Sequence, residues 1–330
     1  MPEHESLRDA DRRRIGRRAF LSGMAGIAAQ NLHAQPAPIP IIDTHIHLFD
    51  TNRPQGVPYP DKSNATLYQP ALPARYRKIA QPLGVVGAIE VEASPWIEDN
   101  LWVLDIAAND TIIVGTVGDL EPGKPEFPEY LERYHRNPLF RGIRYGNLWG
   151  RDIGAELNKA EFIAGLKRLA DANLVLDTAN PRPALIEAMV RVTDRIPNLR
   201  IVIDHLPQLD PPTESSALKQ YEANLHELAK RPQVYVKISE VLRRVNGRVP
   251  SDLNFYRSRL DQLWDIFGED HLIFGSDWPN ADNWAPFETG LNLVREYFTG
   301  KGRAAAEKYF WKNSVAAYHW IRRDPSQPEG

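Results

Sequence analysis

The chain has no cysteine among its 330 residues. This absence excludes disulfides, thiolate nucleophiles, thiolate metal sites and cysteine lipidation. Basic residues are not in excess either, because 40 lysines and arginines stand against 43 acidic residues, for a formal net charge of -3. With no basic surface indicated, we expect no nucleic-acid partner. The remaining composition, 42% hydrophobic and 25% charged, is that of an ordinary globular protein.

Three further signatures are missing. No Gly-x-Gly-x-x-Gly follows the first predicted strand, which removes the main support for a nucleotide-binding open sheet. No Gly-x-Ser-x-Gly motif suggests a serine nucleophile. The apolar stretch 19–29 is much shorter than the roughly 20 residues that a membrane span needs. We therefore expect no stable membrane span.

The first 34 residues have the features of a targeting segment. Residues 16–22, Gly-Arg-Arg-Ala-Phe-Leu-Ser, resemble a twin-arginine export signal, and Ala34 precedes a plausible cleavage point. We predict a twin-arginine-type export signal over 1–34, the twin-arginine export machinery as a partner, and a periplasmic or secreted mature protein. A generic basic leader or a disordered cytoplasmic tail is the alternative. Six arginines precede the apolar stretch: Arg8, Arg12, Arg13, Arg14, Arg17 and Arg18.

Short β-branched runs alternate with longer stretches of helical spacing along the rest of the chain. Several of the runs are continuously apolar, as is typical of parallel strands buried on both faces. The eight predicted strands are 39–47, 85–91, 112–117, 140–145, 174–178, 201–205, 234–238 and 272–276. The clearer predicted helices are 101–108, 160–172, 183–195, 217–230, 256–267, 287–298 and 303–322.

This alternation predicts an α/β protein with a (β/α)₈ TIM barrel, formed by a single domain over 35–330. An open doubly wound sheet is the rival architecture. Residues 49–73 are rich in Pro, Asn and Tyr, and we expect them to form a long loop over the mouth of the barrel.

His45 and His47 stand at the end of the first predicted strand. Alternate residues of a strand share a face, so both imidazoles point the same way. Together they can bind one metal ion or polarise one substrate oxygen. Chemistry in a barrel of this kind lies at the C-terminal ends of the strands. Other strands end in or near polar residues as well: Glu92, Arg144, Asp177, His205, Lys237 and Asp277.

The order of these motifs resembles the amidohydrolase superfamily, and more narrowly its lactonase branch. That branch includes hydrolases of sugar-acid lactones and of a pyrone dicarboxylate lactone. The resemblance implies a hydrolase that opens the ring of a small-molecule lactone by attack of water. The segments that carry it are 43–50, 141–144, 204–205, 236–239 and 274–279.

Roles follow from the resemblance residue by residue. It implies that Asp277 is the general base and that His45, His47 and His205 complete the catalytic set. Arg144 matches an arginine that holds a substrate carboxylate or ring oxygen. The remaining predicted substrate-binding residues are Lys237, Glu92, Asp177 and Trp278.

The resemblance leaves metal dependence open. Metal-rich members carry a lysine or histidine on strand 4 or 5, where this chain has Arg144 and Asp177. We therefore expect no two-metal site. Two options stand, namely one Zn²⁺ held by His45, His47 and Asp277, or catalysis without metal.

Two other functions fit the same residues. One is a metal-dependent decarboxylase or amide hydrolase of the same superfamily. The other is an exported sugar-acid binding protein without catalysis, because a fold does not dictate an activity.

Overall fold

The computed structural model describes residues 37–329. The predicted export signal over 1–34 lies outside the described residues. Within the described part, no helix combines the length and the apolar character that crossing a membrane requires.

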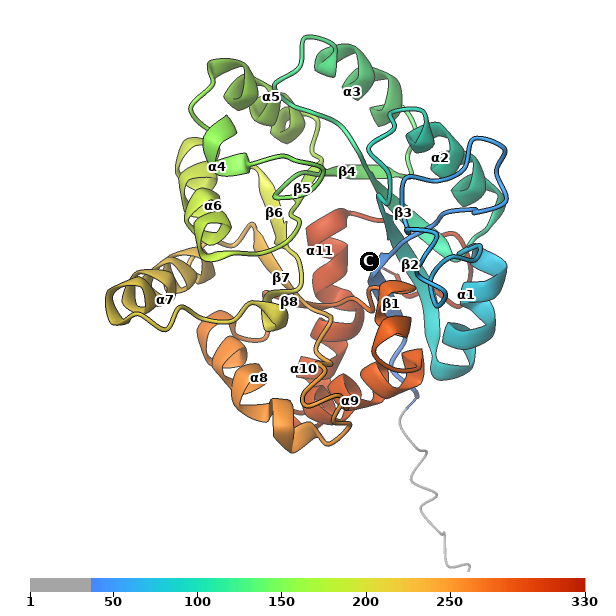
Figure 1. The fold of residues 1–330 in the computed structure, drawn as a ribbon, viewed down its shortest axis with the longest axis vertical. Coiled ribbons are helices and arrows are strands. Elements are labelled where there is room, and N and C mark those ends of the chain that lie inside the picture. Colours follow the sequence, from blue (N-terminus) through green and yellow to red (C-terminus); the bar gives the residue numbers. More distant parts are fainter. Residues whose placement is uncertain (1–36, 330) are drawn as a thin grey trace, which may run out of the picture. The chain divides into compact units, whose positions relative to one another are not determined.

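Eight parallel strands form one sheet in which each strand pairs with the next along the chain (Figure 1). Residues just beyond the eighth strand bring it against the first, because the amide of His47 donates to the carbonyl of Trp278 over 2.7 Å. The predicted (β/α)₈ barrel is thereby confirmed. The strands are β1 Ile41–Ile46, β2 Val85–Val91, β3 Ile113–Gly118, β4 Phe140–Arg144, β5 Val175–Asp177, β6 Arg200–Ile203, β7 Val234–Ile238 and β8 Leu272–Phe274.

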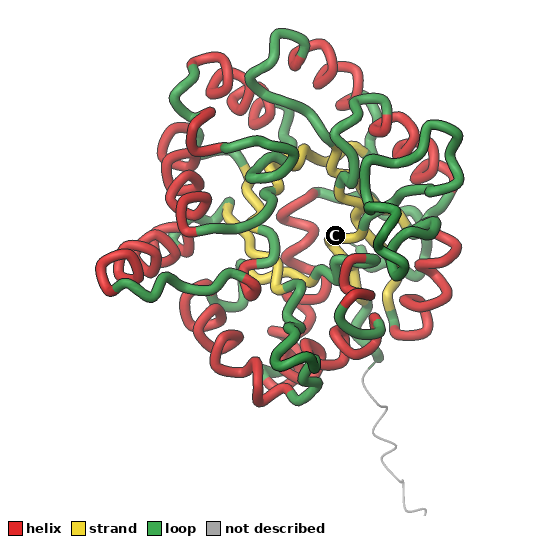
Figure 2. The backbone as a smooth tube through the Cα atoms, viewed as in Figure 1, coloured by secondary structure: helices red, strands yellow, loops and turns green. Residues whose placement is uncertain are grey.

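Most helices lie around the strands on the outside of the barrel, whereas α11 appears in the middle of the ring of strands in this view (Figure 2). Three of them, α1, α3 and α4, are absent from the sequence prediction, and α1 and α3 each carry a proline in their first turn. The helices are α1 Pro73–Ala80, α2 Asp99–Asn109, α3 Phe127–His135, α4 Ile153–Glu156, α5 Ala160–Asp171, α6 Pro183–Arg195, α7 Ser215–Ala229, α8 Leu253–Phe267, α9 Phe287–Gly300, α10 Arg303–Glu307 and α11 Asn313–Tyr318.

Helix α8 shows how local sequence sets an element and its orientation. Asp252 caps its first turn by accepting a hydrogen bond from the amide of Asn254. The helix ends at Gly268, whose φ of 67° is readily adopted by glycine. Its buried residues recur every three or four positions and face the barrel. They are Leu253, Tyr256, Leu260, Leu263 and Phe267.

The C-terminal segment covers the end of the barrel at which the strands begin. It is one helix, 303–322, in the prediction, but in the structure a π-helical turn, Lys308–Lys312, separates α10 from α11. Arg141 and Arg200, at the starts of β4 and β6, donate to main-chain oxygens at the end of α11. Side chains of this segment join the interior apolar cluster of the strands. The cluster is Ile42, Ile89, Val91, Val114, Val117, Val175, Val202, Tyr235, Ile273, Ala317, Tyr318 and Trp320.

The connection from β1 to α1 contains no helix or strand, in agreement with the predicted loop 49–73. Phe49 and Ala71 pair through two main-chain hydrogen bonds and fix the base of this loop. Farther along, the hydroxyl of Tyr59 donates to Oδ1 of Asn280 over 2.5 Å. Because Asn280 follows β8, this bond joins the loop after β1 to the segment after β8, at the point where the first and last strands meet.

Candidate active site

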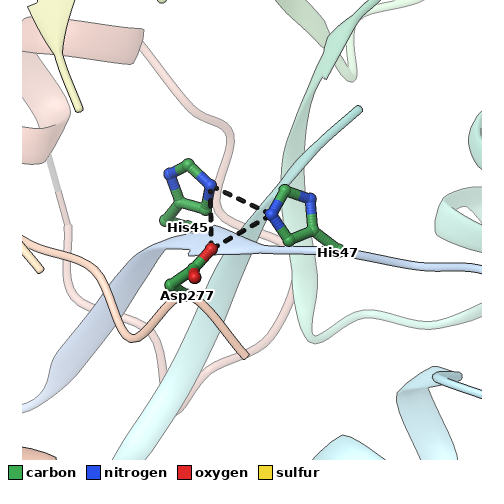
Figure 3. Close-up of side chains that lie close together, drawn as sticks. All are labelled: His45, His47 and Asp277. Carbon is green, nitrogen blue, oxygen red and sulfur yellow. Dashed lines mark hydrogen bonds and ion pairs between the residues drawn. The ribbon is translucent and has the colours of Figure 1, made fainter. Parts of the chain in front are cut away.

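Closure of the barrel brings Asp277 to the His-x-His pair of β1. The amide of Asp277 donates to the carbonyl of His45 over 2.9 Å, which fixes the carboxylate beside both imidazoles. Oδ1 of Asp277 lies 3.4 Å from Nε2 of His45 and 3.1 Å from Nε2 of His47. The two Nε2 atoms are 3.2 Å apart (Figure 3). The structure thus brings three sequence-predicted residues together in one buried cluster.

These three atoms have the spacing of metal ligands. Two ligand atoms that each lie about 2.0 Å from a tetrahedral ion are about 3.3 Å apart. The observed separations are 3.1, 3.2 and 3.4 Å. In addition, Nδ1 of His47 lies 2.7 Å from the carbonyl of Val91, a contact of the kind that orients a ligating imidazole. The residues present therefore fit one divalent metal ion, which as a Lewis acid would activate water or a carbonyl group.

His205 and Glu240 extend the cluster from the ends of β6 and β7. Nε2 of His205 is 3.9 Å from Oδ1 of Asp277, and its Nδ1 is 3.7 Å from Oε2 of Glu240. His205, Glu240 and Asp277 have φ values of 50°, 49° and 60°, a left-handed conformation that costs about 1–2 kcal/mol in a residue other than glycine. Backbone strain of this kind concentrates at functional sites.

Glu240 is a functional candidate that the sequence analysis missed. It comes two residues after the end of β7, where the strand-end rule that selected Asp277 would also have selected it. Burial raises the pKa of Glu240 to about 8. When protonated, its carboxyl group donates a hydrogen bond to Asp277.

A cavity of about 610 Å³ opens above these residues. Arg144 is the one arginine or lysine that lines it within the described part of the chain. Its Nε donates to the carbonyl of Thr178 over 3.1 Å, and its NH2 lies 3.3 Å from Oδ2 of Asp204. The lining residues are His47, Tyr59, Glu92, Ala93, Arg144, Leu148, Trp149, Asn180, His205, Glu240, Asp277 and Asn280.

Of two tryptophans near the site, Trp149 lines this cavity and Trp278 does not. Trp278, the predicted substrate-binding aromatic residue, is fully buried with its ring centroid 5.2 Å from that of Tyr76 in α1. It does not line the cavity. Trp149 does, and its indole nitrogen lies 3.2 Å from Oε2 of Glu92. Of the two predicted substrate-binding residues, Glu92 lines the cavity and Trp278 packs away from it.

Lys237 and Asp177 do not lie at the mouth of the cavity either. Both are fully buried beneath the histidines, where Nζ of Lys237 is 2.8 Å from Oδ2 of Asp177 and 2.9 Å from Oδ1 of Asp204. Tyr318 donates to the same oxygen of Asp177 over 2.6 Å. The structure thus places these two predicted substrate-binding residues in a buried ion-pair network below the cavity.

Burial dominates the electrostatics of the site. It raises the pKa of Asp277 to about 7 and that of Glu92 to about 8. Burial, reinforced by Arg144, lowers the pKa of His47 to about 3. Burial and the charge of Lys237 hold the pKa of His45 well below its ordinary value. At neutral pH, both imidazoles of the His-x-His pair are therefore uncharged.

In the ion-pair network below the site, the pKa values of two carboxyl groups are shifted in opposite directions. Burial and the charge of Asp204 raise the pKa of Asp177 well above its usual range. Burial alone would also raise the pKa of Asp204, but Lys237, His45 and Arg144 outweigh it and hold the value well below normal. Asp204 is consequently the charged partner of Lys237.

The chain is similar to two curated lactonases. It is 29% identical over 243 residues to an L-fucono-1,5-lactonase of Burkholderia ambifaria, a match covering 72% of this chain and 80% of that one. It is 25% identical over 283 residues to an L-fucono-1,5-lactonase of Burkholderia multivorans, covering 83% and 94%.

A crystal structure of an amidohydrolase from Burkholderia multivorans with bound zinc has the same fold. Its TM-score is 0.74 at 22% identity, and the match covers 86% of this chain and 100% of that one. The family model described as "Amidohydrolase" matches residues 42–320. This match spans the whole barrel, from β1 to the end of the C-terminal segment, and the chain belongs to the amidohydrolase family.

Proposed function

We propose that this protein hydrolyses a lactone, with Asp277 as the general base. The observation that carries the proposal is the position of Asp277 on the floor of the cavity. Its carboxylate faces three imidazoles, and its pKa is raised to about 7, within the range of an effective base at neutral pH. The two curated relatives named as L-fucono-1,5-lactonases support this reaction class and favour a sugar-acid lactone.

In the proposed reaction, ionised Asp277 takes a proton from a water molecule while that water attacks the ring carbonyl. Negative charge develops on the carbonyl oxygen, where the imidazoles and the guanidinium of Arg144 stabilise it. The ring C–O bond then breaks, and the proton held by Asp277 passes to the departing alkoxide. The product is an open-chain hydroxy acid, and no covalent intermediate forms.

The cavity contains polar groups suited to the rest of such a substrate. Carboxyl groups of Glu92 and Glu240 and the amide of Asn180 line its walls, while Trp149 and Tyr59 provide aromatic surface. Hydroxyl groups of a sugar-acid lactone can both donate to and accept from groups of this kind. We propose that these residues, together with Arg144, bind the substrate.

The test is acid release from a panel of aldonolactones and dicarboxylate lactones, followed with a pH indicator on the chain beginning at Gln35. We expect turnover by the unchanged protein and a loss of roughly 10²-fold or more in Asp277→Asn. Equal rates in both proteins would refute Asp277 as the base.

Two further measurements on the same proteins separate the two alternative functions. Carbon dioxide release from aromatic acids, without turnover of any lactone, would favour a decarboxylase. Tight binding of sugar acids without turnover, unchanged in Asp277→Asn, would favour a binding protein.

A further inference from the structure

A second cavity, which we call the β2 pocket, adjoins the active-site cavity. It lies between the loop after β1, strands β2 and β3, and helix α2, and its volume is about 460 Å³. Tyr59, Glu92 and Ala93 line both cavities, so the two spaces share one wall. The lining residues that represent the four elements are Phe49, Glu90, Thr116 and Trp102.

The carboxyl group of Glu90 faces the β2 pocket with one oxygen unpaired. Glu90 is 1% exposed, and its Oε1 has no hydrogen-bond partner within the described part of the chain. Buried polar atoms of native proteins are nearly always hydrogen-bonded, so an unpaired one indicates the place of a ligand or an ordered water. Burial and the charge of Glu92 raise the pKa of Glu90 well above its usual range, which favours the uncharged carboxyl group.

Glu90 lies deeper than Glu92 on the same side of β2. The amide of Glu92 donates to the carbonyl of Val117 over 2.9 Å, so the pairing with β3 continues beyond the last residue of β2. Val91, between the two glutamates, belongs to the interior apolar cluster, and successive residues of a strand face opposite sides. A substrate group that extends past Glu92 into the β2 pocket therefore reaches Glu90.

The charged residues of the pocket wall are already paired. Nη2 of Arg53 donates to Oδ1 of Asp99 over 2.6 Å, and the guanidinium of Arg53 lies 4.7 Å from the ring centroid of Trp102. This pair offers no free charge to an ionic ligand. The unpaired oxygen of Glu90 instead suits a neutral hydroxyl group, which can donate to a carboxyl oxygen and can accept from a carboxyl proton.

We propose that the β2 pocket binds the hydroxylated side arm of a lactone substrate and that Glu90 is the residue that determines specificity for this hydroxyl group. The inference rests on the lactonase function proposed above and adds which part of the substrate is recognised. With the ring carbonyl beside Asp277, the arm extends past Glu92, and its terminal hydroxyl group pairs with Oε1 of Glu90. A methyl group in that place leaves the oxygen unpaired. Sugar-acid lactones with a terminal hydroxymethyl group are therefore better substrates than their deoxy counterparts.

The first test compares lactones that differ only in this hydroxyl group. Two suitable pairs are L-galactonolactone with L-fuconolactone and L-mannonolactone with L-rhamnonolactone. We expect kcat/KM of the wild-type protein to be about 10-fold or more higher for the hydroxymethyl member, because a site built for a hydroxyl group rejects an analogue that leaves its polar atom unpaired. Equal kcat/KM within each pair would show that only water pairs with Glu90 and would overturn the proposal. This comparison needs no variant to fold.

Variants of Glu90 test whether the preference originates there. Glu90→Leu should abolish the preference by lowering kcat/KM for the hydroxymethyl lactone alone, whereas Glu90→Gln can still donate and accept and should keep most of it. Thr116→Val is the matched control, because the hydroxyl group of Thr116 lies in the same pocket but already donates to the carbonyl of Leu139 over 3.2 Å. A preference that survives in Glu90→Leu would refute the role of Glu90. Circular dichroism establishes that each variant is folded.

A binding measurement separates this inference from the proposed reaction. Calorimetry with 1,5-anhydro-L-galactitol and 1,5-anhydro-L-fucitol, ring ethers without a carbonyl group, detects recognition of the arm without turnover. Tighter binding of the first ether that is lost in Glu90→Leu, with no turnover of any lactone, would refute the reaction and support the pocket assignment. Turnover without a preference in binding or in kcat/KM would refute the pocket assignment and leave the reaction standing. Absence of both turnover and binding would refute both.

Discussion

The hydroxyl of Tyr59, in the long loop after β1, donates a 2.5 Å hydrogen bond to Oδ1 of Asn280 beyond β8. Nδ2 of Asn280 in turn lies 3.2 Å from Oδ1 of Asp277. One amide side chain thus holds both the loop at the mouth of the cavity and the proposed base on its floor.

Tyr59→Phe should raise KM and leave kcat nearly unchanged. The variant loses the bond between the loop and Asn280, worth about 1 kcal/mol or roughly fivefold in binding, but keeps the bond to Asp277. Asn280→Ala removes both bonds and should lower kcat as well. Steady-state kinetics on the lactone with the highest kcat/KM give KM and kcat separately for each variant. A fall in kcat of equal size in the two variants would contradict it.

The activity should rise with pH through about 7. Burial raises the pKa of Asp277 to about 7, and only the ionised carboxylate accepts a proton, so kcat/KM increases as the pH passes that value. A profile that is flat between pH 5 and 9, or that falls as the pH rises through 7, would exclude Asp277 as the base. The charged and titratable groups that face it are His45, His47, His205, Glu240, Arg144, Asp204 and Tyr59.

Replacement of Glu240 should move that pH profile in a defined direction. The hydrogen bond from Glu240 lowers the pKa of Asp277, so Glu240→Leu should shift the rising limb to higher pH. Glu240→Gln keeps a donor and should shift it less. A shift to lower pH in Glu240→Leu would mean that repulsion between the two carboxyl groups outweighs the hydrogen bond.

Tyr318→Phe should destabilise the barrel by about 1–3 kcal/mol, because the variant removes a hydrogen bond to a buried oxygen of Asp177. Tyr309→Phe is the control. Its hydroxyl is also buried but donates to the main-chain oxygen of Ile238, and its loss should cost about 1 kcal/mol. Urea unfolding followed by circular dichroism gives both values. Wild-type stability in Tyr318→Phe would show that Asp177 does not depend on that donor.

Export of the chain depends on residues outside the described structure and stays a prediction. The double variant Arg17→Lys, Arg18→Lys should hold the full-length protein in the cytoplasm of a bacterium with twin-arginine export. Arg12→Lys with Arg13→Lys preserves the charge and lies outside the motif, so it serves as the control. Cell fractionation and immunoblotting locate the protein. Equal export of both variants would refute a twin-arginine signal.

The barrel and the centre of the site could be predicted from sequence because both depend on short-range order. Apolar runs at regular intervals indicate parallel strands, and alternation along β1 places His45 and His47 on one side. The start of α8 is three residues earlier than predicted, because the capping role of Asp252 was not recognised. Such boundaries depend on caps rather than on the periodic pattern.

The positions of Trp278, Lys237 and Glu240 have physical reasons as well. Trp278 follows Asp277, whose left-handed backbone interrupts the alternation of a strand, so the indole packs against Tyr76 instead of facing the cavity. Lys237 stands before the last residue of β7 and therefore lies one layer deeper than a strand-end side chain. Glu240, which the sequence analysis missed, lies two residues beyond the end of β7, within reach of the strand-end rule that selected Asp277.

Closure of the barrel interior depends on a segment that is synthesised long after the first strands. Tyr318 and Trp320 lie in the same interior cluster as residues of β1 and β2. Those early strands leave the ribosome long before the side chains that fill the space between them. Although domains generally fold from their N-terminal side during translation, this interior cannot close until Tyr318 and Trp320 have emerged. The nascent chain therefore has to remain soluble as an incomplete barrel until these late side chains have been synthesised.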